Sequence, residues 1–165
     1  MTVACRDASP DDAPLLTDLF TRVFCETFAH LYDPVDLAAF LAQHGESQWR
    51  EQLSDHDFAV RLAEDAGYAK LGPLRLPVET QTRALELRQL YILAPWRGTG
   101  VATALMDWTI DEARRRSAAE LYLSVYTDNP RARRFYDRYG FEEVGPYKFM
   151  VGNHADEDVI MRLAL

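Results

Sequence analysis

The sequence contains little cysteine, no long apolar run and no excess of basic residues. Cys5 and Cys25 are its only cysteines, and two thiols at this separation match neither a disulfide framework nor a zinc-ligand pattern. No apolar stretch approaches the roughly 20 residues that span a bilayer, and residues 1–7 lack the basic region and apolar core of a signal peptide. These absences predict a cytoplasmic protein with no membrane partner and no metal.

The net charge of the chain is −8, which argues against nucleic acid as a general partner. The charges are also unevenly distributed. Residues 97–138 carry eight arginines and six acidic residues, whereas the rest of the chain has a net charge of −10. This pattern suits an anionic ligand at the basic segment and a cationic second ligand elsewhere. Solvated helix faces are the simpler explanation for part of it, such as Arg114–Arg116.

A length of 165 residues and a hydrophobic content of 48% predict one folded domain over residues 1–165. Hydrophobic periodicity and capping signals predict helices at 10–28, 34–44, 46–53, 100–117 and 130–139. Alternating and β-branched stretches predict strands at 1–7, 58–62, 68–71, 84–93, 121–126, 141–144 with 147–151, and 158–165. Two of the helices would cross over between strands, so the expected fold is α+β (α/β) with a mixed sheet.

The strand at 84–93 leads into a glycine-containing turn and then directly into a helix. Gly98 and Gly100 lack a Cβ atom, so the backbone can take positive φ angles and a ligand can approach it closely. Backbone N–H groups at such a turn, together with a helix N-terminus, form a site for an anion such as phosphate. A tight turn with no ligand is the alternative for a single motif of this kind.

Two motifs together resemble the GCN5-related N-acetyltransferase (GNAT) superfamily. The first is Arg97-x-x-Gly100-x-Ala102, which is similar to the family's acetyl-CoA pyrophosphate loop. The second is Asn129-x-x-Ala132-x-x-Phe135-Tyr136-x-x-x-Gly140-Phe141, which is similar to a second segment of the family. The resemblance covers nearly the whole chain. It implies a three-layer fold with a mixed, mostly antiparallel central sheet flanked by helices.

A narrower resemblance links the chain to PaiA-type acetyltransferases, which act on polyamines. It rests on Phe149–Gly152 with Asp158-x-Ile160-Met161 near the end of the chain, and on Glu26-Thr27-Phe28, Tyr32 and Asp36-Leu37 near the start. One departure is visible, because only residues 63–67 remain where the family has a longer hairpin. The sequence leaves open whether this short hairpin is native or reflects an absent loop.

The resemblance implies acetyl-CoA as cosubstrate. The backbone and side chain of Arg97 would bind its pyrophosphate, and Leu90 and Ile92 would pair with its pantetheine arm, with the Ile92 N–H at a bulge directed toward the thioester oxygen. Core packing is the alternative for Leu90 and Ile92, and helix capping alone would explain Asn129. The full set of expected cofactor-binding residues is Leu90, Tyr91, Ile92, Arg97, Gly98, Thr99, Gly100, Val101, Ala102, Asn129, Ala132, Phe135 and Tyr136.

The same resemblance assigns proton chemistry to two residues. Tyr136 is the expected general acid, because a tyrosine hydroxyl is protonated at neutral pH and can protonate the departing thiolate. Glu86 is the expected general base, and an exposed strand glutamate is its alternative explanation. The acceptor pocket would draw on Glu26, Tyr32 and Tyr126. The four histidines share no metal-ligand spacing, although His30 lies near this predicted pocket.

The preferred function is therefore transfer of an acetyl group from acetyl-CoA to a primary amine, by direct attack in a ternary complex. The acidic body and the narrower resemblance favour a polyamine or another small cationic amine. The alternatives are acetylation of a protein N-terminus or other amine, and a non-catalytic acyl-CoA-binding module on the same fold. A dinucleotide-binding fold is disfavoured, because Thr103 stands at the third glycine position and Glu120 begins its strand. The acceptor, the base and the oligomeric state stay open, with a homodimer as one alternative.

Overall fold

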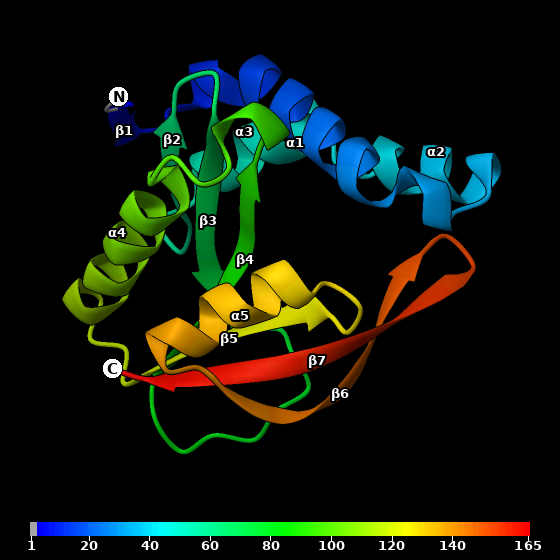
Figure 1. Ribbon diagram of the computed structural model, residues 1–165. Coiled ribbons are helices and arrows are strands. Elements are labelled where there is room, and N and C mark those ends of the chain that lie inside the picture. The colour runs from blue at the N-terminus through cyan, green and yellow to red at the C-terminus, as the bar shows by residue number, and fades with distance from the viewer. Residues whose placement is uncertain (1–2) are drawn as a thin grey trace.

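A computed structural model describes residues 3–165 of the chain (Figure 1). Its helices are α1 (Ala13–Phe28), α2 (Pro34–Ala42), α3 (Glu46–Leu53), α4 (Val101–Arg115) and α5 (Pro130–Tyr139), with short 3-10 turns at Pro10–Asp12, Ala29–Leu31 and Ala94–Trp96. Its strands are β1 (Cys5–Asp7), β2 (Ala59–Ala63), β3 (Gly67–Pro73), β4 (Ala84–Ile92), β5 (Glu120–Tyr126), β6 (Glu142–Val151) and β7 (His154–Ala164).

The seven strands form one sheet in the order β1-β2-β3-β4-β5-β7-β6. Every neighbouring pair is antiparallel except β4 and β5, which are parallel and joined by the crossover helix α4. The chain then passes through α5 to the edge strand β6 and returns as β7 between β6 and β5. The fold is thus the α+β arrangement that the sequence predicts, with a mixed and mostly antiparallel sheet.

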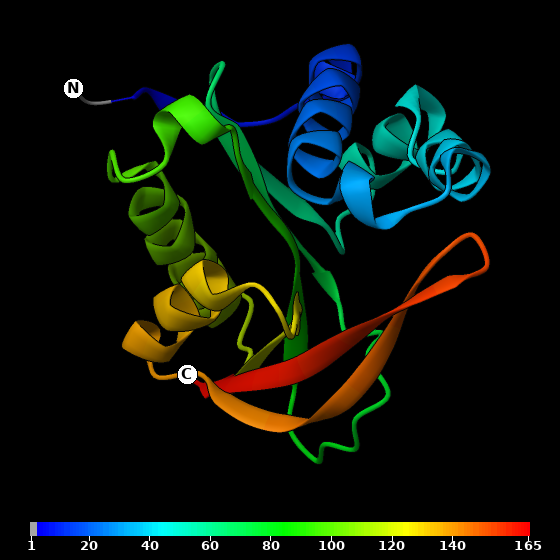
Figure 2. The same ribbon diagram turned by 45° about the vertical axis from the view of Figure 1, so that its right-hand side comes forward.

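Helices cover both faces of the sheet and make its three layers (Figure 2). On one face α4 contributes Leu105 and Met106, and α5 contributes Tyr136, to a core that includes Leu121 of β5. On the other face α1, α2 and α3 bury Phe20 and Trp49 in a second core. Each such large apolar side chain contributes about 1.5–3 kcal/mol when fully buried.

The sheet opens between its two parallel strands. β4 and β5 pair only through Ala84–Glu86 and Glu120–Tyr122. Beyond these three residues the strands diverge, so the second half of β4 lies beside no strand on that side. A cleft in the middle of the sheet follows from this short pairing.

Most predicted elements are confirmed, and the differences lie near the ends of the chain. The strand predicted over 1–7 is present only at Cys5–Asp7, and residues 1–2 lie outside the described part. The interrupted strand predicted over 141–151 is one continuous strand with a register irregularity between Glu143 and Gly145. The last strand begins at His154 instead of Asp158, because a two-residue turn folds β7 back along β6 over its full length.

Residues 63–67 form a complete tight hairpin between β2 and β3. Ala63 pairs with Gly67, and Asp65 adopts a positive φ of 41° to complete the turn. The carbonyl oxygen of Ala66 then accepts a hydrogen bond of 2.9 Å from the Leu93 backbone N–H. The hairpin therefore supports the end of β4 that leads into the glycine turn.

Candidate active site

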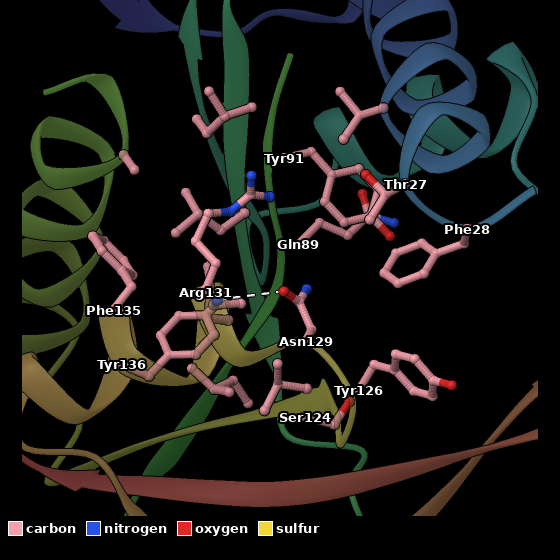
Figure 3. Close-up of a pocket in the computed structure, with 18 of the residues that line it drawn as sticks. Thr27, Phe28, Gln89, Tyr91, Ser124, Tyr126, Asn129, Arg131, Phe135 and Tyr136 are labelled. Atoms are coloured by element: carbon pink, nitrogen blue, oxygen red, sulfur yellow. Dashed lines mark hydrogen bonds between the residues drawn. The ribbon is translucent and has the colours of Figure 1, made fainter. Parts of the chain in front are cut away.

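A cavity of about 450 Å³ occupies the cleft between β4 and β5 (Figure 3). Its walls come from α1, β4, the glycine turn, β5, α5 and β7. It brings together most of the predicted cofactor-binding residues, namely Leu90, Tyr91, Ile92, Arg97, Gly98, Gly100, Ala102, Asn129, Ala132, Phe135 and Tyr136. Thr99 and Val101 belong to the same turn but do not line the cavity, because Thr99 faces solvent and Val101 is buried in the core.

The glycine turn has the backbone conformation that the sequence predicts. Gly98 has a φ of 75° and Gly100 a φ of 92°. A Cβ atom at either position would meet no atom within 4 Å, so the backbone conformation and not close packing requires glycine there. The helix α4 begins at the next residue, Val101, and the first N–H groups of a helix lack partners within it. The turn and this helix end together suit an anionic group at the mouth of the cavity.

The C-terminal end of α1 holds the turn in place. Arg97 donates a hydrogen bond of 3.2 Å from Nη2 to Thr27 Oγ1 and lies 3.9 Å from Glu26 Oε2. The same Glu26 oxygen accepts a hydrogen bond of 3.1 Å from the Ala94 backbone N–H. Glu26 does not line the cavity, so its role in the structure is to position the turn and its arginine.

A basic wall continues from the turn along α5. Arg131, Arg134 and Arg138 line the cavity beside Arg97. Burial and the neighbouring Arg97 charge lower the pKa of Arg131, although a guanidinium stays charged at neutral pH. The basic segment noted in the sequence thus forms one end of the cavity, where phosphate groups would be stabilised.

Tyr136 reaches the cavity from α5 and is 9% exposed. Its ring packs against Phe141 with 5.7 Å between centroids, and burial raises the pKa of its hydroxyl above the ordinary value. Among residues 3–165 its hydroxyl has no hydrogen-bond partner, so it is free to meet a ligand. Asn129 caps the same helix, since its side-chain oxygen accepts a hydrogen bond of 3.3 Å from the Ala132 N–H.

The irregularity in β4 lies four residues before the expected position. Lys70 pairs with Gln89 and Leu71 pairs with Leu87, so Arg88 is the extra residue of a bulge. Ile92 instead pairs regularly with Gly67 and is buried against α4. The bulge predicted at Ile92 is therefore wrong, and the strand bends near the point where β5 separates from it.

Glu86 does not lie in the cavity. Its carboxylate is buried and accepts hydrogen bonds from the backbone N–H groups of Arg75 (2.9 Å) and Leu76 (3.2 Å). It also lies 3.6 Å from Arg88. The carboxylate thus fixes the loop between β3 and β4, and this position does not favour the base role predicted for it.

Another part of the cavity wall is acidic and aromatic. Asp156 and Asp158 of β7 line it together with Tyr32 and Tyr126, two of the residues predicted for the acceptor pocket. His30 is not among the lining residues. Asp156 accepts a hydrogen bond from the Tyr32 hydroxyl and lies 3.1 Å from His154 Nε2.

The two aspartates were not predicted as site residues. Asp158 was noted only as part of a family-like tail, although the alternation Asp156, Asp158, Ile160 places all three on one face of a strand. Burial and the neighbouring Asp156 charge raise the pKa of Asp158 to about 7, and Ser124 partly opposes this. A carboxyl that titrates near neutral pH in a cleft is typical of a functional site.

Two further observations concern metals and membranes. Among residues 3–165, no group of three or more His, Cys, Asp and Glu side chains is arranged to hold a metal ion. Within the same part of the chain, every helix is too short or too polar to cross a bilayer.

Comparison with known proteins agrees with this geometry. The family model described as "Acetyltransferase (GNAT) family" matches residues 17–141. The chain belongs to this family. An uncharacterized N-acetyltransferase of Mycobacterium tuberculosis is 32% identical to this GNAT protein over 155 residues, which cover 91% of this chain and 96% of that one.

Solved structures share the fold over the whole chain. The PaiA N-acetyltransferase from Thermoplasma acidophilum in complex with coenzyme A has a TM-score of 0.79, with 17% identity and 100% of both chains covered. A ribosomal-protein-alanine N-acetyltransferase from Brucella melitensis has a TM-score of 0.74 and 28% identity, with 99% of this chain and 100% of that chain covered. This GNAT protein is an acetyl-CoA-dependent N-acetyltransferase, and the comparisons leave its acceptor open.

Proposed function

We propose that this protein transfers the acetyl group of acetyl-CoA directly to the primary amine of a small cationic acceptor, such as a polyamine. One observation carries the proposal. A single cavity is lined both by arginines with the glycine turn before α4 and by two buried carboxylates with aromatic side chains. An anionic cosubstrate and a cationic acceptor suit these two parts of the wall, with their reactive groups meeting between them.

In this arrangement the pyrophosphate of acetyl-CoA lies at Gly98–Gly100 and the N-terminus of α4. The pantetheine arm runs along the free side of β4, where Leu90 and Tyr91 have no neighbouring strand. This position is supported by the short β4–β5 pairing, which leaves backbone groups of β4 available to an extended ligand. Asn129 and Ala132 line the facing wall.

Tyr136 is proposed as the acid that protonates the thiolate of coenzyme A. Its raised pKa keeps the hydroxyl protonated, and its lack of a partner among the described residues leaves the proton available. Packing against the core alone would not require a hydroxyl that faces the cavity. We therefore propose Tyr136 as a catalytic residue and do not propose Glu86 as the base.

The proposal is tested by measuring release of the coenzyme A thiol with a panel of amines. The panel contains spermidine, putrescine, a peptide with an N-terminal alanine, and a buffer blank. We expect turnover with the two polyamines well above the blank. Preferred turnover of the peptide would instead support acetylation of a protein N-terminus, and no turnover with any amine would contradict the proposal.

Two further expectations go with this function. Cys5 and Cys25 are free thiols, which suits a reducing compartment, and we propose that the protein acts in the cytoplasm.

We also propose a homodimer, on the family resemblance alone. Size-exclusion chromatography with light scattering distinguishes a dimer from a monomer.

A further inference from the structure

We propose that Asp156 and Asp158 form the receptor for the ammonium group of the acceptor, and that Asp158 is the base that takes its proton. The inference rests on the proposed function and names residues that perform two of its steps. It is carried by the position of the two carboxylates, by the charges around them and by the walls of the cavity next to them.

The two carboxylates are presented on the same face of one strand. Asp156 is 5% exposed and Asp158 is 7% exposed, and both line the cavity. Asp158 is held from both sides, because it pairs with Tyr126 of β5 and with Tyr147 of β6 in the sheet. Asp158 is the last paired residue of the β5–β7 ladder and lies within the longer β6–β7 ladder, and a position on a paired strand is a rigid platform for a reacting group.

Asp158 lacks a positive partner. Lys148 pairs with Glu157 and His154 pairs with Asp156, whereas Asp158 takes part in no ion pair among residues 3–165. The titratable groups that surround it are Asp156 and four tyrosines, namely Tyr32, Tyr91, Tyr126 and Tyr147.

The basic side chain beside this cluster is His154, which lies 3.1 Å from Asp156, and none of the five groups around Asp158 is a cation. Two carboxylates placed this close in a poorly hydrated site disfavour one another's charge, and buried charges are normally paired. A bound ammonium group would supply the missing positive charge. Such a cation would stabilise the charged form of Asp158, which has no ion-pair partner among the described residues.

The aromatic side chains around the carboxylates suit an alkyl amine. Phe28 packs edge-on against Tyr126 with 6.2 Å between ring centroids, and Phe24 stacks on Tyr32 at 5.7 Å. Both pairs border the cavity. Aromatic faces attract ammonium groups and also cover methylene carbons. A flexible chain of methylenes that carries amino groups therefore fits this end of the cavity.

The reaction can be written so that protons balance. The carboxylate of Asp158 takes one proton from the ammonium group, which leaves a neutral amine with a free electron pair. That pair forms the C–N bond to the thioester carbonyl carbon, and the C–S bond breaks. Tyr136 gives its proton to the sulfur and recovers one from the new amide nitrogen, and Asp158 later returns its proton to solvent.

The pKa of Asp158 agrees with this assignment. Burial and Asp156 raise it to about 7, so the carboxylate is present at and above neutral pH and still has useful basicity. A bound ammonium lowers this pKa, since it stabilises the carboxylate. The base is consequently charged when the acceptor is in place.

The test compares Asp158→Asn with Glu157→Gln as the matched control. Glu157 is the neighbouring carboxylate on the opposite face of β7, where it is exposed and bound to Lys148. We measure kcat/KM for spermidine from pH 6 to pH 9 and the affinity for acetyl-CoA by calorimetry. Wild type and Glu157→Gln should show a rise in kcat/KM with an apparent pKa near neutral.

Asp158→Asn should lose at least about 100-fold in kcat/KM and lose this rise, with acetyl-CoA affinity unchanged within about two-fold. The kcat/KM of Asp158→Asn should fall much less with trifluoroethylamine as acceptor. This amine is largely neutral at the assay pH and needs no base. Asp156→Asn should act mainly through a higher KM for spermidine, because Asp156 binds the ammonium without taking its proton.

Three results would overturn the inference. The first is a wild-type pH profile in Asp158→Asn, and the second is loss of acetyl-CoA binding together with activity, which would assign Asp158 a structural role. The third is an equal loss for spermidine and trifluoroethylamine, which would exclude a role as base. If the wild-type protein acetylates no amine at all, the proposed function itself fails, which is distinct from these three results.

Discussion

Burial raises the pKa values of two side chains that line the cavity, Tyr136 and Asp158, with opposite consequences for their charge. Tyr136 ordinarily titrates far above neutral pH, so a higher pKa keeps it neutral and able to donate a proton. Asp158 ordinarily titrates near pH 4, so a pKa of about 7 brings its charge change into the working range. One residue is thereby suited to act as an acid and the other as a base, the pattern expected where one site moves protons both ways.

Replacement of Tyr136 by Phe tests the acid. The change removes one hydroxyl and keeps the ring that packs on Phe141. We expect kcat to fall by about 10²–10⁴-fold, with the acetyl-CoA Kd unchanged within about two-fold. Steady-state kinetics and calorimetry measure the two quantities, and an unchanged kcat would remove Tyr136 as the acid.

Replacement of Asp158 by Asn tests the buried charge through stability. The folded pKa of about 7 lies above the unfolded value near 4. The folded state therefore binds the proton more tightly, and stability from this group is greatest below about pH 4 and lost as the pH rises through 7. Because Asp158 borders the cavity and is not enclosed in the core, we discount the full pKa difference and expect Asp158→Asn to be more stable than wild type at pH 8 by about 1–3 kcal/mol, or roughly 3–10 °C in Tm.

The difference in Tm should shrink as the pH is lowered from 8 to 5, which thermal unfolding at several pH values measures. Glu157→Gln serves again as the control, because its carboxylate is exposed. A difference that is constant with pH would show that the carboxyl of Asp158 does not titrate in this range.

At the scale of elements, the site depends on the point where β4 and β5 separate. Three paired residues hold the strands together, the bulge at Arg88 bends β4 just beyond them, and the hairpin at Ala63–Gly67 supports the far end of β4. The glycine turn then directs the chain into α4. We therefore expect cofactor binding to depend on how these elements meet more than on any single side chain.

Replacement of Gly100 by Ala tests the turn. The residue has a φ of 92°, where a side chain is strained even though space is available. We expect a loss of about 1 kcal/mol in the free energy of unfolding and a several-fold weaker acetyl-CoA Kd, because the turn must shift to relieve the strain. Gly145→Ala is the matched control, since Gly145 also has open space but no positive φ. Equal effects of the two changes on the Kd would contradict this account of the turn.

Local sequence signals predicted most of these elements. They also predicted residues of the glycine turn and of α5 that line the cavity, but not Asp156 and Asp158. Ser9 and Pro10, Asp33 and Pro34, and Asn129 and Pro130 mark helix starts that the structure confirms. The bulge was misplaced because strand register depends on the partner strand, which no local pattern reveals. Glu86 was expected in the site for a similar reason, since its contacts come from the distant backbone of Arg75 and Leu76.

At the scale of the whole molecule, the basic and the acidic parts of the sequence both contribute to the wall of one cavity. The basic segment 97–138 contributes Arg97 and the arginines of α5, while the acidic remainder contributes Asp156 and Asp158. The sequence could not show that these two aspartates face the basic segment, because β7 reaches β5 only through the long return of the chain past β6. That placement is the basis on which we propose a cationic acceptor.

The most direct test of the central claim is the ratio of kcat/KM for putrescine to that for γ-aminobutyrate, with saturating acetyl-CoA. Both molecules carry the same reacting amine on a chain of similar length, and they differ in whether a second ammonium or a carboxylate follows. An acidic receptor should favour putrescine by at least about tenfold, equivalent to ~1.4 kcal/mol. Equal values, or a preference for γ-aminobutyrate, would contradict the account of an acetyltransferase whose acceptor end selects cations.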